Sequence, residues 1–290
     1  MEQRIKGTTR LLGLIGSPVG HSNSPAMQNY GFRALGIDAA YLAFDIKEEK
    51  VPDAIAAMRT LNMQGANVTM PCKTAAAQNV DELSPAAELI GAVNTIVNRD
   101  GVLFGHITDG EGFVANLKDH GVEVADKNIV IFGAGGAATA IQVQCALDGA
   151  KSLTIFNPRD PFFERAEAMV EKIKAKVPDC QVELYDLDAK DTIREKMDQA
   201  DILVNGTLLG MKPKEDTSVI NDPSLFHEGL VVADVVYNPK ETRLLREAKE
   251  HGCITVEGSG MLLWQGVAAF KLFTGQDMPV EDVKRDVFDN

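Results

Sequence analysis

A strand-like apolar run that leads straight into a glycine-rich loop most constrains the fold of this chain. The segment Asn128–Phe132 is apolar after its first residue, and the loop Gly133–Ala138 follows at once, before a helical stretch to Leu147. Its spacing is G-x-G-x-x-A, in which the first glycine permits a tight turn, the second lets the backbone approach a pyrophosphate, and the small third residue allows close packing. The phosphates would lie at the positive end of the helix. The residues predicted to contact a dinucleotide are Gly133, Ala134, Gly135, Gly136 and Ala137. A merely structural glycine-rich turn is the alternative.

Apolar strands alternate with helical segments along nearly the whole chain. From residue 113 onward the strands, such as Leu153–Phe156, lack inside–outside alternation and are separated by helices, which is typical of a parallel sheet covered on both faces. Earlier, Val93–Val97 and Val102–Gly105 flank an Asp-Gly turn and predict a hairpin. We expect an α/β protein with a Rossmann-type domain over 113–254 and a substrate domain from 1–112 and 255–290, with the active site in the cleft between them.

Charge and cysteine usage exclude several classes of partner. The 290 residues carry a formal net charge of -13, so the surface repels nucleic acid phosphate and anionic lipid, and an anionic substrate must be held by local groups. The four cysteines lie far apart without a C-x-x-C pair, which indicates free thiols and no metal site. Neither a signal peptide nor a membrane-spanning run is evident. We expect a cytoplasmic protein with no nucleic acid or membrane partner.

The end of the second strand of the expected Rossmann domain bears on the choice of cofactor. It reads Asn157-Pro158-Arg159-Asp160. Asp160 would accept hydrogen bonds from the ribose hydroxyls of NAD and would repel a 2′-phosphate, whereas Arg159 would pair with the 2′-phosphate of NADP. We favour NAD, with NADP or dual use left open. That both residues are merely solvated loop charges is a further alternative.

Polar residues also gather at strand ends before the glycine-rich loop, where an α/β sheet presents its ligand site. Ser22 and Ser24 are two residues apart, so in an extended segment their hydroxyls would point the same way and suit a carboxylate or a vicinal diol. Ser24 precedes Pro25 and is equally suited to cap a helix. Asn94 belongs to a further cluster, Gly91–Thr95.

A lysine and an aspartate are the candidate acid–base groups. Asn67 and Thr69 alternate along a predicted strand, Ala66–Met70, and Lys73 follows its end. A lysine beside a pocket acts as a general acid–base when desolvation disfavours its ammonium form, although most lysines are solvated surface charges. Asp109 lies where a strand gives way to a helix, and it is either an N-cap or the group that holds Lys73.

Taken together, these clusters resemble the shikimate dehydrogenase family, including its shikimate/quinate branch. The matching motifs are His21–Pro25, Asn67–Lys73, Gly91–Thr95, Thr108–Gly110, Gly133–Ala138, Asn205-Gly206-Thr207, Tyr237-Asn238-Pro239 and Gly260–Gln265. They occur in the family's order and span almost the whole chain, so the set is far more specific than any one motif.

The resemblance implies a role for each matching position. Lys73 and Asp109 would form the catalytic pair. The residues implied to bind substrate are Ser22, Ser24, Asn67, Thr69, Asn94, Tyr237 and Gln265. Those implied to bind the cofactor, besides the glycine-rich loop, are Asn157, Arg159, Asp160, Asn205, Thr207, Gly258 and Met261.

The family's activity is the reversible, NAD(P)-dependent reduction of 3-dehydroshikimate to shikimate, in aromatic amino acid biosynthesis, and the resemblance implies it here. A quinate or dual quinate/shikimate dehydrogenase, a catalytically inactive NAD-binding regulator and a methylene-folate dehydrogenase on the same plan are the alternatives. Ile107 stands where the family usually has asparagine, so we expect altered packing more than lost activity. Pro158 stands where NADP-binding members usually have arginine, which favours NAD. A homodimer is expected from base rates alone.

Overall fold

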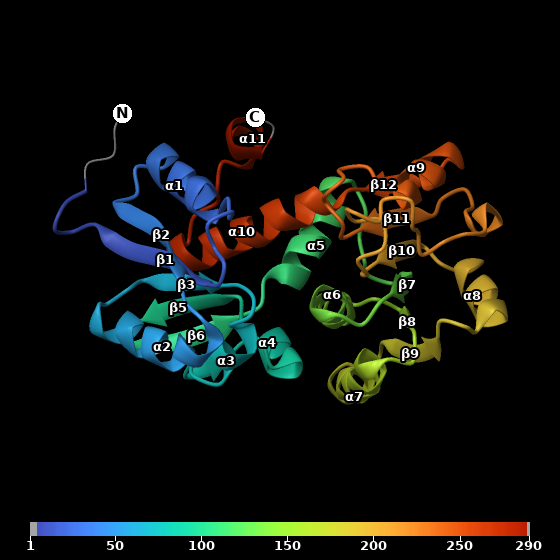
Figure 1. Ribbon diagram of the computed structural model, residues 1–290, viewed down its shortest axis with the longest axis horizontal. Coiled ribbons are helices and arrows are strands. Elements are labelled where there is room, and N and C mark those ends of the chain that lie inside the picture. The colour runs from blue at the N-terminus through green and yellow to red at the C-terminus, as the bar shows by residue number, and fades with distance from the viewer. Residues whose placement is uncertain (1–4, 289–290) are drawn as a thin grey trace. The chain divides into compact units, whose positions relative to one another are not determined.

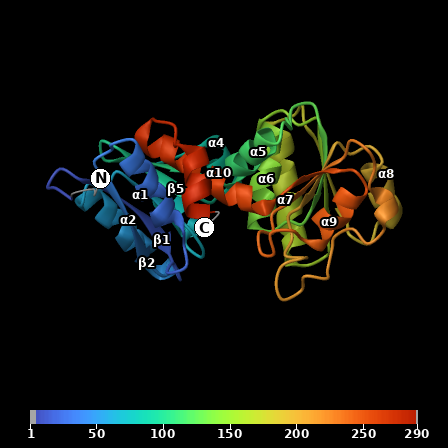
Figure 2. The same cartoon turned by 90° about the horizontal axis from the view of Figure 1, so that it is seen from above.

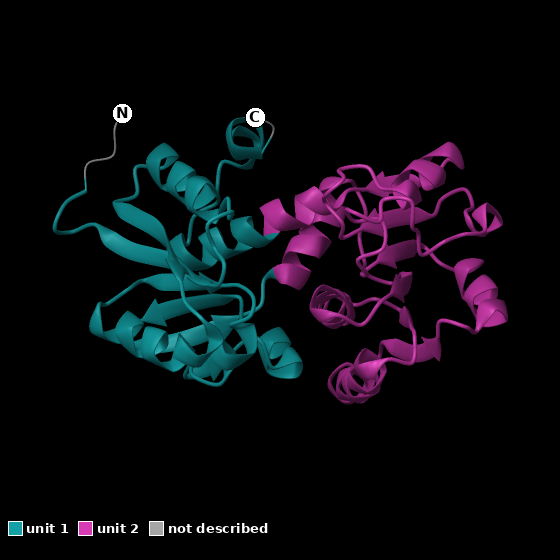
Figure 3. Cartoon of the chain, viewed as in Figure 1, with its two compact units in different colours: residues 1–108, 265–290 teal, residues 109–264 magenta. Residues whose placement is uncertain are grey.

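The computed structural model describes residues 5–288 and confirms an α/β fold (Figure 1). The chain divides into two compact units (Figure 3). Unit 1 contains the chain up to Thr108 and again from Gln265, and unit 2 contains Asp109–Trp264. No helix within residues 5–288 is long and apolar enough to cross a membrane.

Unit 1 is built on a mixed sheet, and the part of it that the structure describes has six strands in the order β2-β1-β3-β5-β6-β4. The strands are β1 (Arg10–Gly16), β2 (Ala39–Asp45), β3 (Gly65–Val68), β4 (Glu82–Leu83), β5 (Thr95–Arg99) and β6 (Val102–His106). β1 runs parallel to β2 and β3, while β5 is antiparallel to β3 and β6. The predicted hairpin is confirmed as β5–β6, with positive φ angles at Asp100 (55°) and Gly101 (94°) in its turn.

Helices cover both faces of this sheet, with α1 and α10 on one face and α2, α3 and α4 on the other (Figures 1 and 2). The helices and short turns are α1 (Ser24–Ala34), η1 (Glu48–Lys50), α2 (Val51–Thr60), α3 (Lys73–Ala77), α4 (Pro85–Ile90), α10 (Gly258–Thr274), α11 (Val280–Val283) and η3 (Lys284–Phe288).

Glycines allow the close approach of α10. A Cβ at Gly65 would lie 2.7 Å from the Phe273 ring, and one at Gly31 would lie 2.6 Å from the Phe270 ring. Phe270 stacks on Phe32 with ring centroids 5.4 Å apart.

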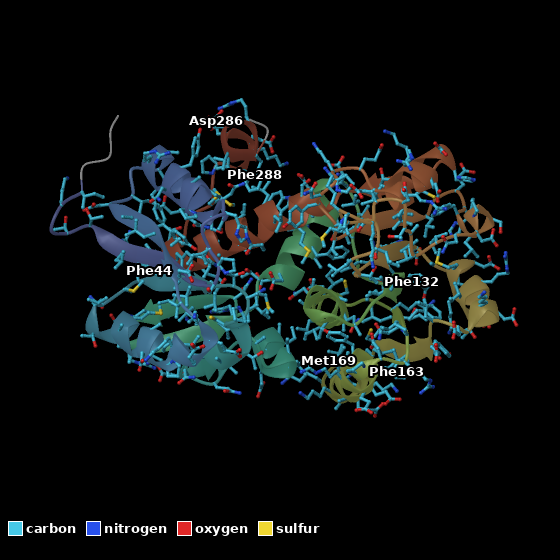
Figure 4. All side chains as sticks on the ribbon, in the orientation of Figure 1. Phe44, Phe132, Phe163, Met169, Asp286 and Phe288 are labelled. Carbon is cyan, nitrogen blue, oxygen red and sulfur yellow. The ribbon has the colours of Figure 1, made fainter. Side chains whose placement is uncertain are left out.

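Unit 2 is built on a sheet of parallel strands in the order β12-β11-β10-β7-β8-β9, the order of a Rossmann fold. The strands are β7 (Asn128–Phe132), β8 (Ser152–Asn157), β9 (Gln181–Asp186), β10 (Ile202–Asn205), β11 (Val231–Asp234) and β12 (Ile254–Val256). Between them lie α5 (Asp109–Asp119), α6 (Gly136–Leu147), α7 (Pro161–Lys176), α8 (Lys190–Met197), η2 (Pro223–Leu225) and α9 (Arg243–Glu250). Three aromatic side chains at paired positions of neighbouring strands stack with ring centroids 5.4 and 5.8 Å apart: Phe132, which Figure 4 labels, Phe156 and Tyr185.

The unit boundaries differ from the expected ones at residues 112 and 255. The whole of α5 belongs to unit 2, because Gly110 lies so close to α6 that a Cβ there would overlap the carbonyl oxygen of Ala140. The first turns of α10 also belong to unit 2, where Gly260 lies against Asn116. The apolar sequence of α10 runs on without a break, so its pattern contains no signal for where one core ends.

Replacing Gly31 with alanine tests the packing between α1 and α10. Alanine favours a helix over glycine by about 1 kcal/mol, but overpacking a core costs about 1–3 kcal/mol. Because Phe270 is itself stacked on Phe32, we expect Gly31→Ala to lower the free energy of unfolding by about 1 kcal/mol in urea denaturation. Gly7→Ala, with open space around its Cβ, is the control. A stabilised Gly31→Ala protein would contradict the tight packing.

Candidate functional site

In unit 2, the strand order reverses between β7 and β10, and the loops that leave these two strands touch there. A Cβ at Gly133, whose φ is +107°, would lie 3.0 Å from both the Gly206 carbonyl oxygen and Thr207 Cγ2. A Cβ at Gly206 would lie 2.6 Å from the Cβ of Ala138 on α6. Neither glycine leaves room for a side chain, as predicted for the first glycine of the loop. In parallel sheets, ligands bind at such a reversal, beyond the carboxyl ends of the strands.

The first turn of α6 is open to a ligand. Gly135 is the N-cap and forms no side-chain cap, and a Cβ at Gly135 or Gly136 would meet nothing within 4 Å. Gln142 Nε2 donates to the Gly133 carbonyl oxygen at 3.0 Å and holds the loop on the helix. Backbone N–H groups at a helix N-terminus bind phosphate, so these residues fit a pyrophosphate.

Asn205, at the end of β10, is held entirely by protein groups. Its Oδ1 accepts hydrogen bonds from the N and Oγ1 of Thr207, at 3.0 and 2.7 Å. Its Nδ2 donates to the Leu209 carbonyl oxygen at 3.1 Å and to Asp234 Oδ1 at 2.9 Å. Asn205 was predicted to bind the cofactor, but with these bonds formed it shapes the loop that carries Thr207.

Sequence analysis missed Asp234, which completes this network. Only 2 % of its surface is exposed, and it accepts hydrogen bonds from Asn205, Val236 N (2.9 Å) and Thr242 Oγ1 (2.7 Å). Desolvation by burial raises the pKa of this carboxyl from 3.8 to about 6, against the lowering effect of its three donors. The position of Asp234 at the end of an apolar strand was the one signal in the sequence that it belongs to the site. Nothing in the sequence indicates that this strand end contacts Asn205.

At the end of β8, the two charges that bear on the cofactor are both engaged. Asp160 caps α7 through a 2.9 Å bond from Phe162 N, and its Oδ1 also accepts from Asn157 Nδ2 at 2.9 Å. Arg159 Nε lies 2.9 Å from Asp186 Oδ2, and its guanidinium lies 4.6 Å from the ring centroid of Phe163. Both charges thus have partners within the protein, although the Arg159 side chain is 70 % exposed.

A cavity of about 610 Å³ lies in unit 2 beside the glycine-rich loop. Its lining includes Gly133, Pro158, Leu187, Thr207, Leu209 and Ile220. These side chains come from the ends of several parallel strands and from the segment after β10. The rest of the wall includes charged side chains such as Asp188, Lys190 and Asp222, so the cavity combines apolar and polar surface, as the base and the ribose of an adenosine require. Leu187, Leu209 and Ile220 escaped prediction because their local sequence contains no motif.

In unit 1, the hydroxyls of Ser22 and Ser24 come together, though not by the predicted route. They lie 3.2 Å apart within a turn, in which Ser22 N donates to the Val19 carbonyl oxygen at 3.1 Å, and the expected extended segment is absent between them. The prediction that Ser24 caps a helix is wrong, because α1 begins at Ser24 and its N-cap is Asn23, which forms no side-chain cap. Both hydroxyls are partly exposed.

A chain of buried hydrogen bonds crosses the sheet of unit 1. Tyr41 donates to Asn67 Oδ1 at 2.8 Å, and Asn67 Nδ2 donates to Thr95 Oγ1 at 2.9 Å and to the Asn94 carbonyl oxygen at 3.2 Å. Asn94 Oδ1 accepts from Thr108 N at 2.8 Å. Asn67 has both donor hydrogens engaged, so it orients its neighbours and is less suited to contact a ligand. β3 ends at Val68 rather than Met70, and Thr69 lies beyond it.

The remaining predicted residues lie at the ends of elements. Lys73 is the first residue of α3 and is half-buried, and its carbonyl oxygen accepts from Val93 N at 3.0 Å. Asp109 begins α5 in unit 2, where the exposed Tyr237 and the buried Gly258 and Met261 also lie. Gln265 is the first residue of the second segment of unit 1. The next residue, Gly266, is anchored by a 2.9 Å bond from Gln28 Nε2 to its carbonyl oxygen.

Comparison with known proteins identifies the family. Residues 14–96 match the shikimate dehydrogenase substrate binding domain, and residues 258–287 match the shikimate 5′-dehydrogenase C-terminal domain. A shikimate dehydrogenase (NADP(+)) of Listeria monocytogenes serotype 4b is 47% identical over 286 residues, which cover 99% of this chain and 98% of the relative. The chain belongs to the shikimate dehydrogenase family.

Two further members of the shikimate dehydrogenase family show its range. A quinate/shikimate dehydrogenase of Escherichia coli is 46% identical over 275 residues, or 95% of each chain. The crystal structure of shikimate 5-dehydrogenase from Listeria monocytogenes in complex with shikimate and NAD superposes with a TM-score of 0.96, at 47% identity and 99% coverage of both chains. Similar proteins are thus named for shikimate and for quinate, and one named for NADP(+) and one crystallised with NAD are among them.

Within this family member, Ile107 fills the position where asparagine is usual, and only 4 % of its surface is exposed. It lies between the strand that ends at His106 and the helix that begins at Asp109. Thr108, its neighbour, keeps its hydrogen bonds to Asn94. The Ile107 side chain is therefore part of the apolar core of this protein.

The raised pKa of Asp234 predicts how stability depends on pH. A carboxyl whose pKa is higher in the folded state contributes most to stability below its unfolded pKa of 3.8, and this contribution is lost as the pH rises through about 6. Asp234→Asn lacks this dependence. The variant should therefore gain about 1 kcal/mol relative to the unaltered protein between pH 5 and pH 7.5, in urea denaturation at both pH values. Parallel pH dependence in both proteins would contradict the assignment.

Proposed function

We propose that this protein catalyses the reversible, NAD(P)-dependent interconversion of shikimate and 3-dehydroshikimate. The observation that carries the proposal is 47% identity, over 99% of the chain, to a shikimate dehydrogenase (NADP(+)). The geometry of each unit supports the proposal. Unit 2 has a Rossmann sheet with an open glycine-rich loop. Unit 1 has the paired hydroxyls of Ser22 and Ser24 and the chain of buried hydrogen bonds that includes Asn94.

We propose that local groups offset the charge that would otherwise repel the substrate. The Ser22 and Ser24 hydroxyls, 3.2 Å apart, would donate to the two oxygens of the carboxylate. Thr69, Asn94 and Gln265 would contact the ring hydroxyls, and the exposed Tyr237 would lie near the carboxylate. Neutral donors suit this task in an acidic protein, because they bind an anion without adding a buried charge.

We assign the acid–base step to Lys73. When bound, NAD(P)H supplies a hydride to the C3 carbonyl carbon of 3-dehydroshikimate. As that bond forms, negative charge develops on the carbonyl oxygen, and the Lys73 ammonium stabilises it and gives it a proton. Asp109 would hold Lys73 in its acidic form and in place. In the reverse direction the neutral amine accepts the hydroxyl proton as the hydride leaves.

Replacing Lys73 tests this step. Lys73→Ala should lower kcat by about 10²–10⁴-fold, because general acid–base groups contribute that much, while KM for shikimate changes little. The measurement is the rate of cofactor reduction, followed by absorbance, with shikimate as the varied substrate. Lys47→Ala, an exposed lysine of unit 1, is the matched control and should keep full activity. A turnover equal to that of the unaltered protein would refute the role of Lys73.

We propose a preference for NAD, and the ion pair between Arg159 and Asp186 supports it. A 2′-phosphate approaching Arg159 meets the carboxylate that already lies 2.9 Å from its Nε. Asp160 adds a second carboxylate at the same strand end, while its Oδ2 has room to accept from ribose hydroxyls. The arginine is 70 % exposed, so the pair is weak and the preference should be moderate.

Freeing Arg159 should shift the choice of cofactor. Asp186→Asn keeps an oxygen to accept from Asp188 N but removes the charge that competes with a phosphate. We expect KM for NADP+ to fall about three- to tenfold, with KM for NAD+ nearly unchanged, since a tenfold change corresponds to only about 1.4 kcal/mol. Glu195→Gln is the control, because it also removes one negative charge from unit 2 but at a position on α8 that does not pair with Arg159 in the described contacts. An unchanged ratio of the two KM values would show that Asp186 has no such role.

Offering shikimate and quinate, each with NAD+ and NADP+, separates the remaining candidates. Faster turnover of shikimate supports the proposed reaction, whereas dominant quinate turnover would favour the second candidate, which similarity to the E. coli quinate/shikimate dehydrogenase supports. Nucleotide binding without turnover would favour a regulator, and activity on a folate would favour the methylene-folate enzyme. A role in aromatic amino acid biosynthesis, in the cytoplasm and as a homodimer, completes the proposal.

A further inference from the structure

Asp234 is a buried charge to which the proposed reaction gives no task. Among residues 5–288 it is the only charged side chain buried so fully, with 2 % of its surface exposed. Removing a carboxylate from water is unfavourable unless hydrogen-bond donors surround it, and burial does raise the pKa of this group. Such a group is expected to be retained for what it holds in place.

The donors to Asp234 come from three different segments of unit 2. Asn205 Nδ2 donates from the end of β10, Val236 N from the segment after β11, and Thr242 Oγ1 from the N-cap of α9. Asp234 thus ties the ends of two neighbouring parallel strands to each other and to the helix that follows.

The carboxylate also fixes which way the Asn205 amide faces. An ionised carboxylate only accepts hydrogen bonds, so the amide must present its NH₂ group to Asp234 and its oxygen to the opposite side. That oxygen accepts from Thr207 N and Oγ1, and Leu209 N donates to Thr207 Oγ1 at 3.0 Å. The orientation set by Asp234 therefore determines the conformation of residues 206–209.

We propose that Asp234 is a positioning residue for the cofactor, which acts through Asn205 to hold Thr207 against the glycine-rich loop. Thr207 Cγ2 and the Gly206 carbonyl oxygen lie only 3.0 Å from where a Cβ of Gly133 would be, so a shifted loop would collide with Gly133 or open the site. Thr207 also lines the cavity of unit 2. This inference rests on the proposed dinucleotide site, and Asp234, whose two carboxylate oxygens accept from protein donors, would act on the nucleotide only through Asn205 and Thr207.

Titration calorimetry with NAD+ and, separately, NADP+ tests the proposal without relying on turnover. Asp234→Ala should raise Kd for the nucleotide that binds by about threefold or more, the range that coupled neighbours show. Asp234→Asn should bind within about twofold of the unaltered protein, because its amide oxygen still accepts from Asn205 and Val236 and its NH₂ group faces the Thr242 hydroxyl.

Two comparisons separate positioning from general destabilisation. Ile173→Ala removes a fully buried side chain from α7 and should lower the melting temperature without changing Kd. If Asp234 acts through Asn205, Asp234→Ala combined with Asn205→Ala should raise Kd no further than the larger single effect.

Each outcome decides the matter. Unchanged Kd in Asp234→Ala, or additive losses in the double variant, would overturn the positioning role and leave the proposed function standing. Failure of the unaltered protein to bind either nucleotide would overturn both. If Asp234→Ala does not fold, Asn205→Ala carries the test, because it removes the link between Asp234 and Thr207, and an unchanged Kd in that variant would overturn the proposal.

Discussion

Unit 2 depends on the close approach of two backbone loops at the point where the order of its parallel strands reverses, between β7 and β10. Gly133 and Gly206 leave no space for a side chain, and Ala138 on α6 fills the gap beneath them. Because parallel strands bring their carboxyl ends to one edge, the loops that leave β7, β8 and β10 gather there, and the open first turn of α6 is exposed beside them. A larger residue at any of the three would separate elements whose contact forms the site.

In each unit, one chain of buried hydrogen bonds ends at a predicted ligand residue. In unit 1 the chain runs from Tyr41 through Asn67 to Asn94. In unit 2 it runs from Asp234 through Asn205 to Thr207. An unsatisfied buried donor or acceptor costs about 1–3 kcal/mol, so each member restricts the rotamer of the next. Site geometry is therefore set before any ligand arrives, which is how an enzyme limits reorganisation during reaction.

The proposed preference for cofactor depends on a balance of local charges more than on one residue. Arg159 offers a cation, but Asp186 and the aromatic ring of Phe163 hold it. Asp160 is anchored by its capping bonds, so its position is fixed relative to the strand end.

The sequence by itself determined those features whose causes lie within a few residues. The glycine-rich loop, the hairpin turn at Asp100 and Gly101, and the helix cap at Ser84 are set by local sterics and local hydrogen bonds. The motifs also identified the family, because their order along the chain is itself sequence information.

The tertiary structure decided the contacts between residues that are far apart in the sequence. Asp234 reaches Asn205 across 29 residues only because β10 and β11 pair, and Arg159 meets Asp186 only because β8 pairs with β9. Such contacts follow from strand order and burial, which no local pattern specifies.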